Sequence, residues 1–385
     1  MTQRKRPLII LSSLSLGGAF VLANTAFFMP VYLKSALHFS GREIGMLYAA
    51  WSLTSIVTSF PFGLASDRTP ARHLVVTALV LMGLSLFSQS LLRAFLPFLA
   101  AYLAYGLGQN LFRVSLDALL LKTLPHRVGK TYGLFNGARM LGFTCGGITG
   151  GLLLQHLDFV YTLKLLGLLY LLMSFSWFVL PPTIPVKFGL KTYWDDFRNP
   201  RVILFALWLY LFYLHWGAEF TSYGLFLREN LGLSLKGMGF YMSAEFAMVG
   251  LASVIGGFSL EAGTNLYRLA ALGLFCSGVG HMGMVIEKLP ISLAFRLLHG
   301  LGDGTIMVLS YVGIAKLFRV ERIGGNSGLI TLSIMLGSFT GSLIFGPLGA
   351  RYGYGVPLFV SGAITLGLIP MVFLSKFKEM SRSKS

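Results

Sequence analysis

Long apolar runs alternate with short polar segments along almost the whole chain. Each run is about 20 residues long, the length that a helix needs to cross a hydrocarbon core of about 30 Å. A lone strand in lipid would leave its backbone groups unpaired, so these spans are predicted to be helices. They fall near residues 8–33, 43–65, 73–92, 95–121, 130–156, 160–180, 202–226, 235–258, 267–286, 290–316, 325–349 and 355–375. The pattern therefore predicts an all-α membrane protein with twelve transmembrane helices.

Composition supports a membrane protein and excludes several other classes. Hydrophobic residues make up 55% of the 385 residues and charged residues only 12%, unlike a soluble domain. The net charge of +17 comes from short basic clusters between the apolar runs, so nucleic acid is not an expected partner. Cys145 and Cys276 lie within apolar runs, so neither a disulfide framework nor a cysteine metal site is predicted. The first run continues to about Tyr32 without a small-residue cleavage site, and we interpret it as a retained span.

The distribution of Lys and Arg predicts the orientation in the membrane. Most of these residues lie on the side of the N-terminus, the loops after even-numbered spans and the C-terminal tail. Because cytoplasmic loops are enriched in Lys and Arg, both termini are predicted to be cytoplasmic, in a bacterial-type inner membrane. The longest connection, residues 181–200, lies on the same side and divides the chain into six-helix bundles at 1–180 and 201–385. The other loops are too short for a soluble catalytic domain.

The two halves of the chain share an internal repeat. Glycines and charged residues of the first half recur in the second at an almost constant separation. Matching pairs are Gly63 with Gly257, Asp67 with Glu261, Gly106 with Gly300, and Lys122 with Lys316. Such a register indicates a duplicated six-helix unit. Parallel halves of this kind usually place a substrate site between them near the membrane midplane and rock around it.

The segment GLASDRTPARH, Gly63–His73, places charged residues between the second and third spans. It resembles the signature that the major facilitator superfamily carries in this loop. Pro70 and Ala71 replace a usual glycine and a basic residue. The matching key residues are Gly63, Asp67, Arg68 and Arg72.

Two further motifs extend this resemblance over essentially the whole chain. RLLHGLGDG, Arg296–Gly304, matches a pattern normally found in the fourth helix, but here it lies in the tenth, and the fourth has Tyr102 in place of the arginine. The fifth span carries glycines at the spacing of the family's antiporter signature, with Gly147 in place of its proline. These glycines are Gly133, Gly142, Gly146, Gly150 and Gly151. They let a neighbouring helix come close, either for tight packing alone or for a seal that opens and recloses.

The resemblance implies a fold of two pseudo-symmetric six-helix bundles and secondary active transport by rocker-switch alternating access. It also implies that Asp67 lies against the N-terminal end of the eleventh helix, near Gly325, when the cytoplasmic gate is shut. Arg68 and Arg72 would tie the loop to neighbouring acids or lipid phosphates. A carboxylate at a helix N-terminus contributes about 0.3 to 2 kcal/mol, enough to bias a gate. The expected gating residues are Gly63, Asp67, Arg68, Arg72, Arg113, Asp117 and Glu261.

Ionisable side chains also occur within the predicted spans. Each costs about 2.5 to 3.5 kcal/mol to insert, so we treat them as functional candidates. Three arginines and four acids indicate internal pairing. The residues are Arg113, Asp117, Arg139, Glu219, Glu245, Arg296 and Asp303.

In the first half, Arg113 and Asp117 are four residues apart on one helix face and can form an ion pair near its cytoplasmic end. The pair is either a static support or part of the gate. Gln109 lies one turn deeper on the same stripe. Arg139 lies near mid-membrane, where its charge needs an anionic partner. That partner is either an acidic group of the substrate or an acid from another helix.

In the second half, His215 and Glu219 are four residues apart, and Glu245 lies at mid-depth in the next span. Asp303 follows Arg296 by two turns on the same face and is a second candidate proton site or a partner for an arginine. A carboxylate in such a cavity can bind and release a proton, or it can simply form a hydrogen bond within the bundle. One His and two Glu residues could hold a metal ion, but one i,i+4 pair is weak support, and no metal site is predicted.

Further polar and aromatic residues are candidates to line a cavity. Asn24 is one of them. An aromatic-rich helix serves packing or an interfacial belt more often than binding. The aromatic candidates are Trp208, Tyr210, Phe212, Tyr213, Trp216 and Tyr223.

These features favour a secondary active transporter of a small organic solute, coupled to protons. The glycine pattern of the fifth span favours export over uptake. A lipid or lysolipid flippase, a proton-coupled uptake system, and a non-transporting receptor or assembly protein stay open as alternatives. No nucleotide-binding loop and no nucleophile arrangement occurs, so we expect neither an ATP-driven pump nor an enzyme, and no cofactor. The expected partners are the solute, protons and membrane lipids, and we expect a monomer.

Overall fold

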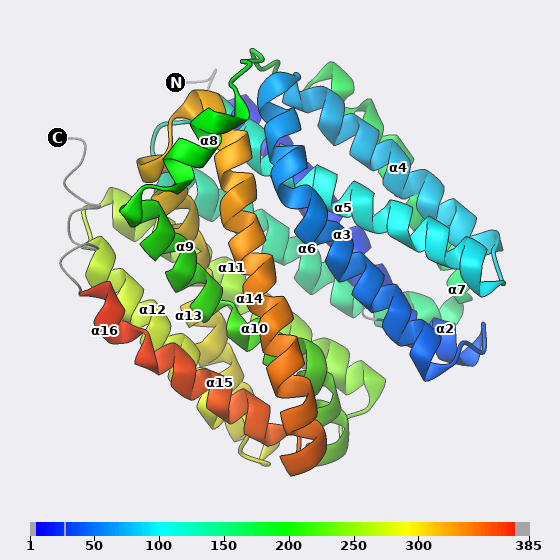
Figure 1. Ribbon diagram of the computed structural model, residues 1–385. Coiled ribbons are helices and arrows are strands. Elements are labelled where there is room, and N and C mark those ends of the chain that lie inside the picture. The colour runs from blue at the N-terminus through cyan, green and yellow to red at the C-terminus, as the bar shows by residue number, and fades with distance from the viewer. Residues whose placement is uncertain (1–4, 27, 374–385) are drawn as a thin grey trace. The chain divides into compact units, whose positions relative to one another are not determined.

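The computed structural model describes residues 5–26 and 28–373, and the regular elements within them are all helical (Figure 1). The chain begins with α1 (Lys5–Ala26), α2 (Met29–Ser35), α3 (Gly41–Arg68), α4 (Ala71–Leu91), α5 (Phe95–Thr123), α6 (Val128–His156), α7 (Phe159–Met173) and the short 3-10 helix η1 (Ser174–Phe178). It continues with α8 (Leu190–Phe197), α9 (Pro200–Phe212), α10 (Leu214–Ala218) and the π-helical segments η2 (Glu219–Tyr223) and η3 (Phe226–Asn230). It ends with α11 (Leu235–Glu261), α12 (Leu266–Gly283), α13 (Leu289–Leu317), the 3-10 turn η4 (Val320–Arg322), α14 (Ile323–Tyr352), α15 (Gly355–Gly367) and α16 (Ile369–Val372).

Local sequence signals fix several helix starts. Ser40 and Glu43 form a capping box at the start of α3, in which each side chain bonds to the other residue's backbone N–H. Asn199 caps α9, whose first residue is a proline, and Ser234 caps α11. These residues supply acceptors for N–H groups that have no partner inside the helix.

Eight described helical segments are long and apolar enough to cross a membrane, judged by length and composition. They are Arg6–Ala26, Ala71–Leu91, Phe159–Phe178, Pro200–Tyr223, Lys236–Glu261, Leu289–Leu317, Val320–Tyr352 and Gly355–Val372. The other predicted spans coincide with α3, α5, α6 and α12, which are also helices. The prediction of an all-α membrane protein is therefore confirmed, and twelve spans are consistent with it.

Four predicted spans consist of more than one helical segment. The first, 8–33, includes α1 and α2, and the sixth, 160–180, includes α7 and η1. The seventh, 202–226, includes α9, α10 and η2, and the last, 355–375, includes α15 and α16. Both α2 and α16 carry a proline within their first two positions, a residue that lacks the N–H needed to continue a preceding helix. Residues 27 and 374–375 of these predictions lie outside the described residues.

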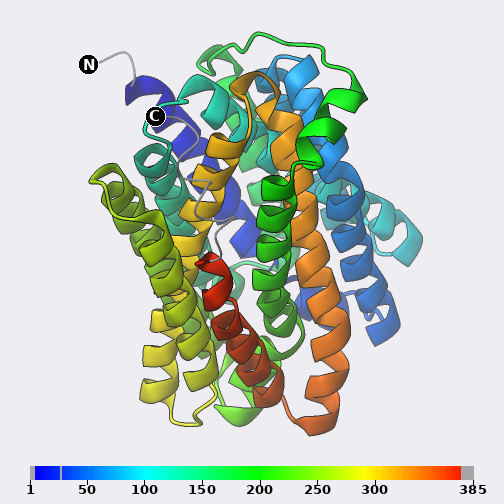
Figure 2. The ribbon, with the colours of Figure 1, turned by 60° about the vertical axis from the view of Figure 1, so that its left-hand side comes forward.

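Contacts divide the chain into two compact units. Unit 1 comprises Met1–Pro125, Gly142–Tyr193 and Val320–Leu332, and unit 2 comprises His126–Leu141, Trp194–Arg319 and Ser333–Ser385. Within unit 1, α5 packs against α3 and α4, and α4 also packs against α7 (Figure 1). Within unit 2, α13 packs against α11 and α12, and α12 also packs against α15 (Figure 2). Helices α6 and α14 each contribute one segment to each unit, and the division into bundles around residues 181–200 stays a prediction.

Glycines bring α6 and α14 close to their neighbours within unit 1. A methyl group on Gly146 of α6 would lie 2.5 Å from the carbonyl oxygen of Phe20 on α1. A methyl group on Gly328 of α14 would lie 2.5 Å from the carbonyl oxygen of Ser59 on α3. No side chain fits at either position without a shift of backbone. Both glycines therefore allow tight helix packing, and the part of Gly146 in a moving seal stays a prediction.

Candidate functional site

The signature loop, Gly63–His73, contains a buried carboxylate at the end of α3. Asp67 accepts hydrogen bonds from the backbone N–H groups of Gly324 (3.0 Å) and Gly325 (2.7 Å) in the first turn of α14. These N–H groups lack partners inside the helix, and the positive end of the helix stabilises the anion. Lys122 Nζ lies 2.8 Å from Asp67 Oδ1, and the Tyr193 hydroxyl donates to Oδ2 at 2.9 Å. The predicted contact with the eleventh span is thus present, while its role in gating stays a prediction.

Gly63 lies one turn before Asp67 on the same face of α3. It faces the backbone of Gly324 so closely that any side chain at position 63 would overlap the Gly324 carbonyl group. The glycine is therefore required for the approach that lets Asp67 reach the start of α14. Glu261, the counterpart of Asp67 in the repeat, is the last residue of α11 and is exposed.

The two arginines of the signature loop contact other groups than expected. Arg68 Nη2 donates to the carbonyl oxygen of Phe188 at 2.9 Å. The guanidinium of Arg72 lies 4.5 Å from the centre of the Trp177 ring, a cation–π contact. Both contacts come from the chain that follows α7, which returns over the loop. Pairing of Arg68 and Arg72 with acids or lipid phosphates stays a prediction.

Tyr193 links this returning chain to the carboxylate. Its side chain is buried, and its ring packs edge-on against Phe60 and Phe188. Burial, and then the negative charge of Asp67, raise the pKa of Tyr193 above its usual value. The hydroxyl therefore stays protonated and donates to Asp67 across the physiological pH range.

Replacing Tyr193 with phenylalanine is expected to destabilise the protein by about 1.5 to 3 kcal/mol, because a hydrogen bond to a buried carboxylate is lost while the ring packing is kept. Thermal unfolding of the purified protein in detergent measures the change. The matched control is Tyr161→Phe, a ring 63% exposed on α7, which is expected to leave the unfolding temperature unchanged. Equal unfolding temperatures for wild type and Tyr193→Phe would show that the hydroxyl contributes nothing.

The first half also contains a network of uncharged polar groups. Gln109 Nε2 donates to the hydroxyls of Tyr105 (2.9 Å) and Tyr170 (2.7 Å), and the Tyr170 hydroxyl donates to the carbonyl of Gly18 (3.2 Å). Asn24 lies on α1, where Nδ2 is 3.3 Å from Thr149 Oγ1 of α6. Both predicted candidates, Gln109 and Asn24, therefore participate in helix-to-helix hydrogen bonds.

The charged candidates of the first half lie on α5 and α6. Arg113 Nη2 donates to Asn110 Oδ1 at 3.0 Å, and Asp117 is buried on the same helix. The guanidinium of Arg139 lies 4.8 Å from the centre of the Phe135 ring. The ion pair of Arg113 with Asp117 and the anionic partner of Arg139 stay predictions.

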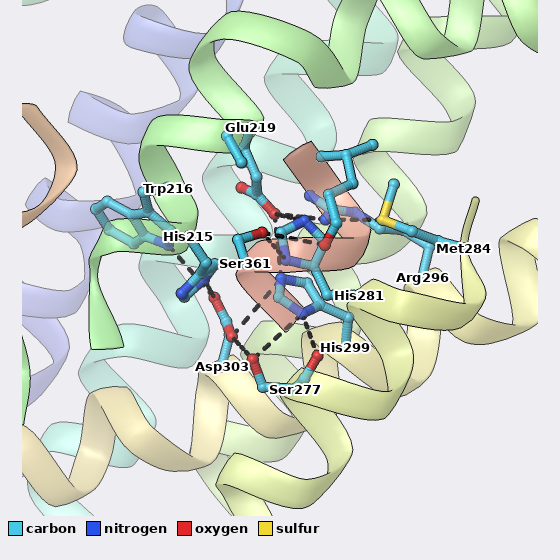
Figure 3. A network of polar contacts seen from close by, with 12 residues as sticks. His215, Trp216, Glu219, Ser277, His281, Met284, Arg296, His299, Asp303 and Ser361 are labelled. Carbon is cyan, nitrogen blue, oxygen red and sulfur yellow. Dashed lines mark hydrogen bonds and ion pairs between the residues drawn. The ribbon is translucent and has the colours of Figure 1, made fainter. Parts of the chain in front are cut away.

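Unit 2 contains the largest concentration of buried charge described. Side chains from α10, η2, α11, α12 and α13 meet there, and most of them appear in Figure 3. Positions 296, 299 and 303 of α13 share one face because they are three and four residues apart. A π-helical segment, a form often found at functional sites, carries Glu219. We call this set the histidine–carboxylate cluster: His215, Glu219, Glu245, His281, Arg296, His299 and Asp303.

Arg296 holds two of the three acids. It is 1% exposed, and Nη1 lies 2.5 Å from Glu219 Oε1 while Nη2 pairs with Glu245 Oε2. Its guanidinium also lies 4.1 Å from the centre of the Tyr223 ring. A planar guanidinium suits such paired recognition better than an ammonium group does. The predicted internal pairing is therefore found for Arg296, with partners from two other helical segments.

Asp303 has different partners. Its Oδ2 lies 3.1 Å from His215 Nε2 and 3.4 Å from Trp216 Nε1. Its Oδ1 accepts a hydrogen bond from Ser277 Oγ at 2.7 Å. These contacts come from a histidine, a tryptophan and a serine, and the role of Asp303 as a proton site stays a prediction.

Two histidines that were not candidates complete the cluster. His299 Nε2 lies 3.1 Å from Glu219 Oε1, and His281 Nε2 lies 3.8 Å from the same oxygen. Both rings are fully buried. His299 stands inside the motif RLLHGLGDG, three residues after Arg296, so helical periodicity could have revealed it. His281 lies in an apolar run with no local signal.

Two groups in the cluster have the residue types of a metal site. They are His215, His299 and Asp303, and Glu219, His281 and His299, with ligand atoms within 4.8 Å of one another. Glu219, however, is already paired with Arg296, whose positive charge opposes a cation at that oxygen. Asp303 is bonded to His215 and Ser277. We therefore interpret the cluster as a hydrogen-bonded network.

The aromatic candidates separate into two sets. Trp208 is buried and stacks with Phe212 within α9, so these rings serve packing. Trp216 and Tyr223 contact Asp303 and Arg296 directly. Tyr213 packs edge-on against Trp216. Part of the aromatic run therefore serves packing, and the lining of a substrate cavity by the other part stays a prediction.

Comparisons with known proteins agree with this architecture. The family model for the Major Facilitator Superfamily matches residues 9–282. The quinolone resistance protein NorA of Staphylococcus aureus (strain MSSA476) is 23% identical over 370 residues, covering 90% of this chain and 91% of NorA. An uncharacterized MFS-type transporter of Methanocaldococcus jannaschii is 22% identical over 335 residues, covering 84% of this chain and 86% of that protein.

Solved structures show the same fold. The human organic anion transporter MFSD10 (TETRAN) superposes with a TM-score of 0.80 at 16% identity, covering 97% of this chain and 100% of the other. The proton:xylose symporter XylE superposes with a TM-score of 0.77 at 12% identity, covering 98% of both chains. With the family model matching most of its length, the chain belongs to the Major Facilitator Superfamily and has the fold of its secondary transporters.

Proposed function

We propose that this transporter exports a small organic solute in exchange for protons, by alternating access. The observation that carries the proposal is the histidine–carboxylate cluster of unit 2. Buried acids and histidines at membrane depth are costly, and they mark proton relays and substrate pathways in transporters. Glu219 and Asp303 each face an imidazole nitrogen that can share a proton with them.

The similarity to NorA supports the choice of solute and direction. Its name connects that protein with quinolone resistance, which favours an organic solute and export. The glycines of α6 that resemble an antiporter signature favour the same direction. We also infer a bacterial inner membrane with cytoplasmic termini, supported by the basic loops and by the bacterial relative, and a protein that acts as a monomer.

The test is uptake of a fluorescent quinolone into proteoliposomes with an imposed pH gradient. If protons are exchanged for the solute, an acidic lumen drives quinolone inward beyond the level of protein-free liposomes. An alkaline lumen would drive uptake by a symporter instead. Absence of flux with both gradients, across quinolones and a wider panel that includes lysolipids, would leave the non-transporting receptor or assembly protein.

Amide substitutions test the assignment of coupling to the cluster. We expect Glu219→Gln, Glu245→Gln or Asp303→Asn to abolish gradient-driven quinolone uptake at one position at least, while solute exchange without a gradient continues. Glu229→Gln, in the segment η3 after the cluster, is the control and is expected to retain driven uptake. If all three cluster variants retain it, the coupling assignment is wrong.

A further inference from the structure

Backbone carbonyl groups fix the protonation of two rings in the histidine–carboxylate cluster. His215 Nδ1 lies 2.6 Å from the carbonyl oxygen of Phe212. His299 Nδ1 lies 2.8 Å from the carbonyl oxygen of Ser277. A carbonyl oxygen can only accept a hydrogen bond, so each Nδ1 must carry a hydrogen. Both rings are buried.

The contact that Nε2 of each ring makes with a carboxylate requires a further proton. In a neutral imidazole with hydrogen on Nδ1, Nε2 is an acceptor, and so is a carboxylate oxygen. Yet His215 Nε2 lies 3.1 Å from Asp303 Oδ2, and His299 Nε2 lies 3.1 Å from Glu219 Oε1. Two acceptors at hydrogen-bonding distance require one proton between them. This proton resides on the imidazole or on the carboxyl group, and in either case each pair of a histidine and an acid holds one added proton.

The charges around these pairs also indicate a total of two added protons. The other ionisable groups near these pairs are Tyr223 of η2, Glu245 and Tyr241 of α11, His281 of α12 and Arg296 of α13. From α14, which packs against α10, the contacting residues are the uncharged Gly341 and Ser342. From α15 the contact is the uncharged Ser361. Three ionised carboxylates and one guanidinium leave two negative charges. Since an uncompensated buried charge is strongly unfavourable, two added protons restore neutrality.

We infer that the cluster holds two exchangeable protons, one shared by His215 and Asp303 and the other by His299 and Glu219. The histidines are therefore proton carriers together with the acids, and the geometry described is the fully loaded form. That these protons drive transport rests on the proposed function. On that basis, two protons are exchanged in each transport cycle.

His281 provides a place for a proton to go next. The Ser361 hydroxyl donates to the carbonyl of Leu358, so it accepts from His281 Nδ1 at 3.3 Å. His281 Nε2 is thus an unprotonated acceptor, and it has no hydrogen-bond partner among the described residues. It lies 3.8 Å from Glu219 Oε1. A small movement of either side chain would let it take the proton that His299 and Glu219 share.

The experiment counts these protons without solute and without a gradient. Protein with 15N-labelled histidine in lipid nanodiscs at about pH 7.5, where ordinary imidazoles are mostly neutral and ordinary carboxyls ionised, is examined by nuclear magnetic resonance and infrared spectroscopy. Imidazolium signals and carboxylic acid bands assigned to the cluster are expected to total two. His215→Gln and His299→Gln are each expected to show one, because a glutamine amide donates to the carboxylate without an added proton. His126→Gln, an exposed loop histidine, is expected to show two.

Neutral imidazoles and ionised carboxylates in the wild-type cluster would overturn the inference. This test needs only the wild-type protein, so it does not depend on whether a variant folds. A total of two that persists in both cluster variants would also overturn the inference. Two bound protons with no gradient-driven flux would reject the proposed function alone. Driven flux with no bound proton would reject this inference alone.

Discussion

Replacement of Arg296 with glutamine is expected to destabilise the protein by about 3 to 5 kcal/mol, because removal of one partner leaves buried charges uncompensated. Glu219 and Glu245 would then face each other's negative charge without the guanidinium that both contact. The free energy of unfolding, from denaturation of the purified protein in sodium dodecyl sulfate, measures the loss.

Two further variants show whether this loss arises from the charge. Arg268→Gln removes an exposed arginine from α12 and is expected to change the free energy of unfolding by less than about 0.5 kcal/mol. The double variant Arg296→Gln/Glu245→Gln removes one acid with the arginine and is expected to recover part of the stability. No recovery would mean that Arg296 contributes through packing on the Tyr223 ring rather than through its charge.

Replacement of Asp67 with asparagine is expected to lower the turnover of transport at least about tenfold, which corresponds to about 1.4 kcal/mol in the barrier. An amide offers one acceptor oxygen, and its NH₂ group would face the N–H groups of α14 and the ammonium of Lys122. The half-saturating solute concentration is expected to stay within about twofold, because Asp67 lies on α3 outside the histidine–carboxylate cluster. Initial rates of quinolone uptake in proteoliposomes give both quantities.

The repeat supplies the matched control for this variant. Glu261→Gln neutralises the corresponding acid of the second half, which is exposed at the end of α11. Glu261 is among the gating residues expected from the sequence, but its side chain is exposed while Asp67 is buried, so the structure leads us to expect a turnover equal to that of wild type. An Asp67→Asn protein with normal turnover and weakened solute binding would contradict the gating assignment.

The helices could be predicted because lipid leaves the backbone few alternatives, so an apolar run of sufficient length specifies a helix. The contact between Asp67 and the start of α14 could be predicted from the resemblance of one short motif. Its other partners could not, since Lys122 and Tyr193 are distant in sequence and carry no motif that connects them with Asp67. They meet it because α5 and the chain before α9 pass beside the end of α3.

Most contacts within the histidine–carboxylate cluster could not be predicted from the periodicity of the sequence. Helices that are apolar on all sides give no indication of which side faces the interior. The partners of Arg296 come from η2 and α11, so no spacing within α13 identifies them. His299 was within reach of periodicity, four residues before Asp303, whereas His281 could be placed only by the packing of α12 on α13.

The sharing of α14 between the two units has a consequence for biosynthesis. Gly63 of α3 lies against the backbone of Gly324 of α14, and the N–H group that donates a hydrogen bond to Asp67 belongs to Gly324, 257 residues later in the chain. While the ribosome is still making the second half, Asp67 and Gly63 have no α14 to pack against. Unit 1 therefore cannot reach its final packing before residues 320–332, which belong to it, have been synthesised.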